Sequence, residues 1–278
     1  MLGKILKFTA VSVAFGAVIL LEKRRPLRNS VESKFVRDTR NLAVSGIAAI
    51  ALMIVEKPVT DRLTKFVERK NVGLLKIFKL PRSLEIFLAV VLLDYSLYIW
   101  HVLTHKIPFL WRFHLVHHVD LDLDASTALR FHFGELTIST AWRAAQILFI
   151  GVSPAALKIW QMLLLPEILF HHSNINLPEK FEQKLSFLLI TPRLHGIHHS
   201  AVQNETDSNW SSGLAIWDWL HGTRRTDVSQ NEIVVGVPAF QNSEDVEFIE
   251  LLKFPFEKQK PSWQVLPAEK PKKLLAKN

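Results

Sequence analysis

The chain has 278 residues, a formal net charge of +8 and no cysteine. The lack of cysteine excludes disulfides, thiolate metal ligands and a cysteine nucleophile, so any metal must bind nitrogen and oxygen atoms. Hydrophobic residues make up 49% of the chain, a share typical of membrane proteins with sizeable polar parts. Because the basic residues lie beside apolar runs, the charge favours anionic lipid head groups over nucleic acid as a partner.

Four apolar regions can enter a bilayer: residues 5–21, 42–55, 84–100 and 136–170. A spanning helix needs roughly 20 apolar residues, so the shorter regions must tilt or re-enter. No small-residue cleavage site precedes the basic run that follows the first region, which favours an uncleaved helix over a signal peptide. The connecting segments hold similar numbers of Lys and Arg, so charge alone does not predict the orientation.

The fourth region is interrupted by Gly151-Val-Ser-Pro154. This combination predicts a turn, and therefore a helical hairpin that returns to the side on which it began. Histidine clusters lie before and after the hairpin, at residues 114–118 and 195–199. The hairpin is thus expected to bring both clusters to one face of the membrane.

Eight of the twelve histidines form three clusters: His101-x-x-x-His105, His114-x-x-His117-His118 and His195-x-x-His198-His199. Residues at i, i+3 and i+4 share one helix face, so each cluster can direct two or three imidazoles at one point. Neutral imidazole is the commonest metal-binding side chain, and eight imidazoles exceed the needs of one ion. The sequence therefore predicts a pair of metal ions.

Other metal chemistries fit less well. A structural zinc site prefers four ligands and usually includes cysteine. The His-Glu-x-x-His motif of metalloproteases does not occur in the sequence, because His132-Phe-Gly-Glu135 lacks the second histidine. The Glu-x-x-His pairs of ferritin-like di-iron proteins do not occur either.

The cluster order, interleaved with apolar helices, resembles that of the fatty acid hydroxylase superfamily. This group includes sterol desaturases, sphingolipid and fatty acid hydroxylases and alkylglycerol monooxygenase. The similarity extends over residues 94–223 and includes four further runs: LWRFH at 110–114, RFHFGE at 130–135, FHHSN at 170–174 and WDWLHGT at 217–223. Two positions depart from the family pattern, since Phe133 replaces a proline and His221 a phenylalanine.

The resemblance implies that the eight cluster histidines bind two iron ions, with His172 as a ninth ligand at the end of the returning hairpin. Asn176 and His221 are not expected to bind metal. His171 is expected to point elsewhere and to hydrogen-bond at the surface. Arg193 has two open interpretations, a lipid-phosphate ligand or an ordinary solvated or capping arginine.

Three residues are expected to support the ligands. Glu135 and Asp94 can orient ligating imidazoles, because such imidazoles commonly donate their second N–H to a carboxylate. The alternative for Asp94 is a pairing with a nearby base. For His132 we expect a supporting role rather than a place among the ligands.

The resemblance implies an all-α, integral membrane bundle of about four spanning or hairpin helices with a cytosolic, helical, histidine-rich cap. Residues 1–83 are expected to form the N-terminal membrane helices and their basic loops. Residues 84–224 correspond to the fatty acid hydroxylase/sterol desaturase-like catalytic region, and residues 225–278 to a polar C-terminal tail.

The implied activity is a membrane-bound, di-iron, O2-dependent hydroxylation or desaturation at C–H bonds of a sterol, a fatty acyl chain or another lipid. Iron changes its oxidation state whereas zinc does not, although zinc can replace iron in purified protein. Two alternatives remain open: a membrane-embedded zinc-dependent hydrolase, and a non-catalytic membrane protein that uses metal only for folding.

The expected partners are a lipid substrate, the membrane and an electron donor. The sequence has no flavin fingerprint and no haem-attachment motif, so two electrons must come from outside. A cytochrome b5-like protein, or a ferredoxin with its reductase, is the implied donor. The expected location is a bacterial inner membrane or the endoplasmic reticulum, with the active site on the cytoplasmic face.

Overall fold

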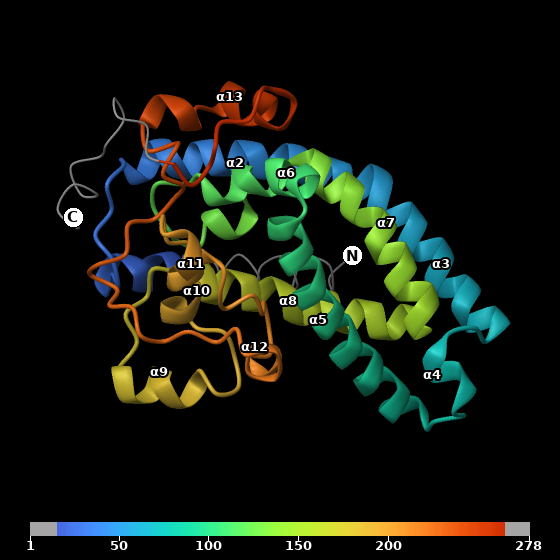
Figure 1. Ribbon diagram of the computed structural model, residues 1–278. Coiled ribbons are helices and arrows are strands. Elements are labelled where there is room, and N and C mark those ends of the chain that lie inside the picture. Colours follow the sequence, from blue (N-terminus) through green and yellow to red (C-terminus); the bar gives the residue numbers. More distant parts are fainter. Residues whose placement is uncertain (1–15, 265–278) are drawn as a thin grey trace.

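The computed structural model describes residues 16–264, and helices are their regular secondary structure (Figure 1). Within this range the chain forms no β-sheet, only isolated β-bridges, so the predicted all-α class is confirmed. The α-helices are α2 (Lys34–Ala51), α3 (Lys57–Lys70), α4 (Leu74–Ile77), α5 (Arg82–Lys106), α6 (Pro108–His118), α7 (Phe133–Ile150), α8 (Pro154–His172), α9 (Glu179–Leu185), α10 (Pro192–His198), α11 (Gln203–Thr206), α12 (Ile216–His221) and α13 (Phe248–Lys253). The π and 3-10 segments are η1 (Leu52–Glu56), η2 (Thr127–Leu129), η3 (Ser243–Val246) and η4 (Phe254–Phe256).

The second apolar region lies inside one long helix that comprises α2, η1 and α3. Proline lacks a backbone N–H and its ring collides with the carbonyl four residues earlier. The π-turn η1 ends one residue before Lys57-Pro58 and accommodates the proline ring. The helix therefore continues to Lys70. The connecting segment expected from residue 57 onward is therefore helical over its first half.

Two helical segments, Lys34–Ile77 and Arg82–Lys106, are long and apolar enough to cross a membrane. They contain the second and third regions expected from the sequence. Of the first expected region, residues 5–15 lie outside the described part of the chain, and the described remainder is helical.

The predicted hairpin is present as α7 and α8. Helix α7 ends at Gly151, whose φ of +87° is readily adopted only without a side chain. Ser153 then caps α8 by accepting a hydrogen bond from the backbone N–H of Ala156, and Pro154 occupies the first turn. A Cβ added to Gly73 would lie 2.2 Å from the Cα of Gly151, so this turn packs directly against the loop after α3.

Apolar side chains from α3, α4, α5, α7 and α8 form one core around the hairpin turn: Val67, Leu75, Ala89, Leu93, Ile147, Ile150, Val152, Ala156, Leu157 and Trp160. Figure 1 shows α2 and α3 running alongside α7, while α5 and α8 form the other side of the bundle. The short helices α9 to α12 gather at the opposite end from α4. These short helices, α9 to α12, are called the cap below, and they lie at one end of the long helices.

A second core joins α2 and α6 to the C-terminal segment. Val237, Ala239 and Phe240 of that segment are buried in the same cluster as Leu115 and Val116 of α6. The segment after residue 225 was expected to be a polar tail. Its apolar residues instead pack against α6, the helix that carries the second histidine cluster.

Candidate metal centre

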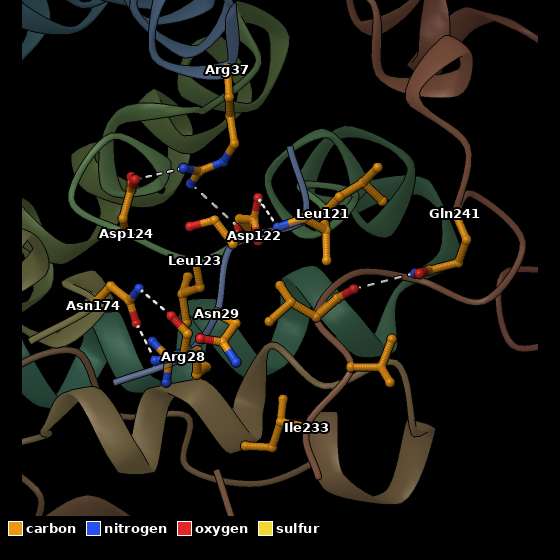
Figure 2. A pocket seen from close by; sticks show the side chains of 14 residues that line it. Arg28, Asn29, Arg37, Leu121, Asp122, Leu123, Asp124, Asn174, Ile233 and Gln241 are labelled. Atoms are coloured by element: carbon orange, nitrogen blue, oxygen red, sulfur yellow. Dashed lines mark hydrogen bonds and ion pairs between the residues drawn. The ribbon is translucent and has the colours of Figure 1, made fainter. Parts of the chain in front are cut away.

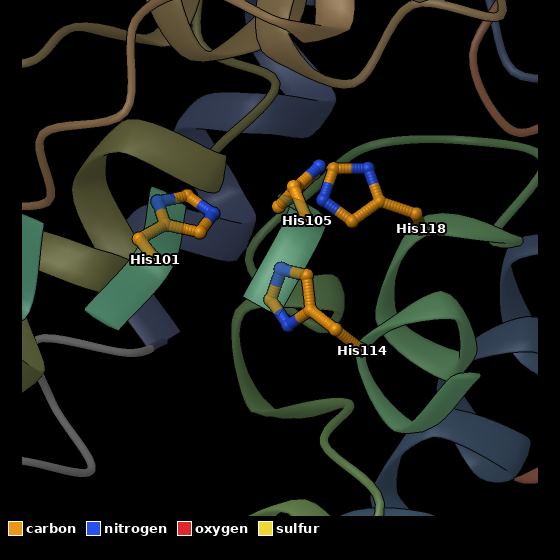
Figure 3. Close-up of side chains that lie close together, drawn as sticks. All are labelled: His101, His105, His114 and His118. Carbon is orange, nitrogen blue, oxygen red and sulfur yellow. The ribbon is translucent and has the colours of Figure 1, made fainter. Parts of the chain in front are cut away.

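The three histidine clusters meet where the long helices join the cap, and seven of their histidines form two sets of four imidazoles together with His172. In each set, one ligand-type nitrogen per residue lies within 4.8 Å of the others. The first set, shown in Figure 3, is His101, His105, His114 and His118. The second set is His117, His172, His195 and His199.

Helical spacing accounts for this division. His101 and His105 are one turn apart on α5, and His114 and His118 are one turn apart on α6, so the first set contains two i, i+4 pairs. His117 points from a different side of α6 and joins the second set. One cluster in the sequence therefore supplies both candidate metal positions.

The nitrogen spacings in the second set fit a shared cation. The Nε2 atom of His172 lies 3.0 Å from Nε2 of His117 and 3.0 Å from Nε2 of His195, and that of His195 lies 3.1 Å from Nε2 of His199. Two imidazole nitrogens that bind one ion at right angles, at about 2.1 Å each, are about 3.0 Å apart.

The protonation of His172 supports the same conclusion. Its Nδ1–H donates to the carbonyl of Ile168 at 2.7 Å, so a neutral ring has a bare lone pair on Nε2. That lone pair cannot donate to the nitrogens of His117 and His195 beside it. Four imidazole nitrogens that converge at this spacing form a donor set that fits a metal ion.

Three further imidazoles are held by acceptors outside the two sets. His101 Nδ1 lies 2.7 Å from the Trp210 carbonyl, and His198 Nδ1 lies 2.9 Å from the Ser208 carbonyl. His114 Nδ1 lies 2.9 Å from Oε1 of Glu135, as the sequence predicted for that carboxylate. In each ring the remaining Nε2 is then directed inward with its lone pair available.

Burial keeps several of these histidines neutral. It is the largest cause that lowers the pKa of His117, His118, His195 and His199 well below the ordinary value, and neighbouring imidazoles lower it further. Burial likewise lowers the pKa of His198 to about 3. The neutral ring is the form that binds metal.

His198 lies between the two sets without belonging to either. Its ring centroid is 4.6 Å from that of His101 and 4.9 Å from those of His105 and His118. Its Nε2 atom is buried and has no hydrogen-bond partner among the described residues. The position suits a further ligand beside the first set.

His171 differs from its expectation. The side chain is buried, not at the surface, and its ring centroid lies 4.2 Å from that of His195. His171 was expected at the surface because it points in a different direction from its neighbour His172 on the helix. The side chain is buried because α10 covers the end of α8. His171 lines the cavity described next.

An apolar cavity of about 380 Å³ extends from the histidines between α2, η1, α5, α7 and α8. Imidazoles from both sets line one end, including those of His101, His114, His117, His172 and His195. Its walls are mainly Ala, Leu, Ile, Phe and Trp side chains. Its size is that of a site for one small ligand or lipid chain.

The fatty acid hydroxylase family model matches residues 86–223. The chain belongs to the fatty acid hydroxylase superfamily. The ornithine lipid hydroxylase OlsE of Rhizobium tropici is 30% identical over 158 residues, 56% of this chain and 46% of that protein. The alkylglycerol monooxygenase of Homo sapiens is 32% identical over 142 residues, 51% of this chain and 30% of that protein.

The cholesterol 25-hydroxylase of Homo sapiens is 28% identical over 150 residues, 51% of this chain and 52% of that protein. The chain thus spans about half the length of these curated relatives, or less. No solved structure is a significant match.

In this member of the fatty acid hydroxylase superfamily, the matched segment contains both histidine sets. The part of the cavity wall contributed by α2 and η1 precedes the match. The candidate metal centre therefore lies within the matched segment, whereas the cavity is completed by residues outside it.

The remaining supporting residues act on the scaffold. His132 caps α7, because its Nδ1 accepts from the Gly134 N–H at 2.9 Å, and α7 carries Glu135. Asp94 accepts hydrogen bonds from Trp217 Nε1 at 2.7 Å and from the Leu214 N–H at 3.1 Å. Asp94 thus joins α5 to Leu214 and to Trp217 of α12. The sequence suggested that it orients an imidazole, but these contacts give it a different role.

The other polar candidates lie away from the two histidine sets. Arg193 donates to Glu182 at 2.9 Å and to Asn176 at 2.7 Å, so the geometry matches its interpretation as an ordinary structural arginine. His221 is exposed and stacks on Tyr95 and Tyr98 of α5.

A buried charge network fixes the loop that follows His118. Arg37 of α2 donates to Asp120 at 2.9 Å and to Asp124 at 2.6 Å, and Arg130 lies 3.0 Å from Asp120. Figure 2 shows Arg37 and Asp124 beside a cavity of about 230 Å³. The network couples α2 to the end of α6, and so to the position of the histidines there.

Proposed function

We propose that the chain is a membrane-bound, di-iron, O2-dependent hydroxylase that acts on a C–H bond of a lipid, with desaturation as the other outcome open to the same centre. The observation that carries the proposal is the joining of two four-imidazole sets to one end of an apolar cavity. The relatives named above carry the names of lipid hydroxylases and a monooxygenase, which supports the same reaction class.

The two sets are the proposed ligands of two iron ions, with His198 as a ninth imidazole beside the first set. Bound iron would supply the change of oxidation state that activation of dioxygen requires. The chain contributes neutral nitrogen donors whose rings are held by Glu135 and by backbone carbonyls. These contacts keep the Nε2 lone pairs in place before an ion arrives.

The cavity walls position the substrate. Leu97, Trp100, Phe131 and Leu136 line the cavity near the histidines, where they exclude water and hold an apolar chain against the centre. No protein nucleophile is required for attack on a C–H bond, so the specificity lies in which carbon the walls bring to the histidines.

The proposed setting is an integral membrane location with the centre on the cytoplasmic side of a bacterial inner membrane or the endoplasmic reticulum. The two candidate spans and the apolar hairpin support it, with α7 and α8 entering the bilayer and returning. The proposed electron donor is a cytochrome b5-like protein or a ferredoxin with its reductase.

The test combines metal analysis with oxygen consumption. Purified chain should contain two iron ions and should consume O2 only with a lipid extract and an electron donor, and mass spectrometry should find one lipid class with one oxygen gained or two hydrogens lost. His172→Ala should lower turnover at least about 100-fold, whereas His221→Ala should keep wild-type turnover. Zinc with hydrolysis and no O2 consumption would instead establish the hydrolase alternative.

A further inference from the structure

The end of the cavity remote from the histidines contains a pair of opposite charges. Glu56, the last residue of the π-turn η1, and Arg143 of α7 both line the cavity. Their side chains are only 13% and 12% exposed. Charged groups among apolar helices are costly, and their usual explanation is a functional one.

Arg143 Nε and Glu56 Oε1 do not hydrogen-bond to each other. Arg143 Nε lies 4.0 Å from Oε1 of Glu56, which is beyond hydrogen-bond range. The Nε atom is buried and has no hydrogen-bond partner among the described residues. A donor and an acceptor therefore lie at the cavity, close enough for one oxygen atom beside them to contact both.

The guanidinium is held from its other sides. Its Nη1 donates to Gln146 at 2.5 Å, and its central carbon lies 4.2 Å from the ring centroid of Trp160. Gln146 in turn donates to Ser96 of α5 at 2.6 Å. Arg143 is thus fixed by α5, α7 and α8, and its Nε–H is left for a ligand.

The local backbone directs Glu56 toward the same point. The π-turn Leu52–Glu56 interrupts an otherwise regular helix, and both of its end residues line the cavity. Turns of this type inside α-helices are frequently found at functional sites.

The distance from the metal centre follows from α7. Glu135 contacts His114, and Arg143 lies eight residues later on the same helix. At a rise of 1.5 Å per residue the two positions are about 12 Å apart along the axis. A ligand that reaches from Arg143 to the histidines therefore spans a separation of roughly this order.

We propose that Glu56 and Arg143 bind a hydroxyl group of the lipid substrate, at the end of the molecule opposite to the carbon that is oxidised. A hydroxyl oxygen accepts from Arg143 Nε–H while its own hydrogen is donated to the Glu56 carboxylate. A carboxylate is attracted by Arg143 but repelled by Glu56, an amine is attracted by Glu56 but repelled by Arg143, and a hydrocarbon leaves both unpaired. The inference rests on the proposed function, because it takes the cavity to be the substrate site.

The test is a binding measurement on the purified full chain in lipid nanodiscs, without an electron donor, so that no turnover occurs. The probes are radiolabelled hexadecan-1-ol, hexadecane and hexadecanoate. Wild-type chain should bind the alcohol roughly 10- to 100-fold more tightly than either of the others, the range expected for a hydrogen bond to a charged group.

The variant for this test is the double substitution Glu56→Leu/Arg143→Met. Removal of one charge would leave the other buried and unpaired, whereas apolar replacement of both is generally tolerated. The double variant should bind hexadecan-1-ol and hexadecane equally. The matched control Glu68→Leu/Arg69→Met, on the exposed face of α3, should retain the wild-type preference.

Equal binding of alcohol and alkane by wild-type chain would overturn the inference, as would tightest binding of hexadecanoate. A double variant that keeps the alcohol preference would overturn it too. These outcomes are separate from the proposed function, since iron content and O2 consumption are measured with the lipid extract. A chain that prefers the alcohol but never consumes O2 would refute the oxygenase and leave the hydroxyl site standing.

Discussion

His117 and His118 are consecutive residues, yet each belongs to a different set of four imidazoles, and their ring planes lie at 83° to one another. A single turn of α6 therefore serves both candidate ions. Replacement of either residue should remove one ion and spare the other.

His117→Ala and His118→Ala are each expected to lower the iron content from two ions to about one per chain. The altered position loses one imidazole and holds metal more weakly, whereas the other position keeps all of its imidazoles. Elemental analysis of purified variants measures this directly. Loss of both ions from one variant, with the fold intact by circular dichroism, would show that the positions are not independent.

Glu135→Leu should weaken metal binding at the first set by roughly 10- to 100-fold, the usual effect of removing a carboxylate that orients a ligand histidine. The carboxylate lies 2.9 Å from His114 Nδ1, and without it the ring loses its preferred tautomer. Glu135→Gln keeps an acceptor oxygen and should have a smaller effect. A competition titration with a chelator ranks the variants, and equal affinities for all would contradict the assigned contact.

Ser139→Phe should obstruct the cavity between Glu135 and Arg143 and leave the ligands untouched. Ser139 lines the cavity one turn from each of these residues. We expect normal iron content with at least about tenfold lower turnover, because the added ring occupies the space of the substrate. Thr137→Phe is the matched control, since Thr137 is exposed on the same helix. Equal turnover in both variants would show that the substrate lies elsewhere.

Arg37→Gln should destabilise the chain by about 3–5 kcal/mol at neutral pH, because it leaves buried carboxylates without their partner. Burial alone would raise the carboxyl pKa of Asp120 and Asp124, but the guanidinium of Arg37 holds both pKa values below the ordinary value. A depressed pKa stabilises the fold above the unfolded pKa of about 3.9, and this contribution is lost as the pH falls below it.

The difference between Arg37→Gln and wild type should therefore be constant from pH 7 to pH 5 and should shrink below about pH 4. Thermal unfolding in detergent at several pH values measures it. The exposed Arg62→Gln serves as the control. A difference that grows on acidification would show that these carboxylates are not the origin of the effect.

Much of the architecture could be predicted from local sequence patterns. The i, i+4 spacing of His101 and His105 indicated which rings share a helix face, and Gly151 and Pro154 marked the hairpin turn. These signals are local, since they depend on helix periodicity and on backbone preferences of single residues. The same holds for the contact between Glu135 and His114, which follows a common chemical pairing.

The rest depends on how distant elements pack. The burial of His171 requires α10 to cover the end of α8, and the contact of Asp94 with Trp217 joins segments more than a hundred residues apart. The sequence showed Glu56 and Arg143 only as two separate charges, because nothing local indicates that η1 faces α7. Contacts between segments this far apart leave no local pattern in the sequence from which they could be predicted.

The order in which the ribosome delivers the chain has a consequence for the biogenesis of this centre. The imidazoles come from α5, α6, α8 and the end of α10, and the side chains that pack behind α6 extend to Phe254. A nascent chain that ends before residue 195 has only part of the second set. Its first set is complete in sequence, but the C-terminal residues that pack behind α6 are absent. Formation of both imidazole sets therefore requires synthesis through residue 199, and the packing behind α6 requires synthesis through Phe254.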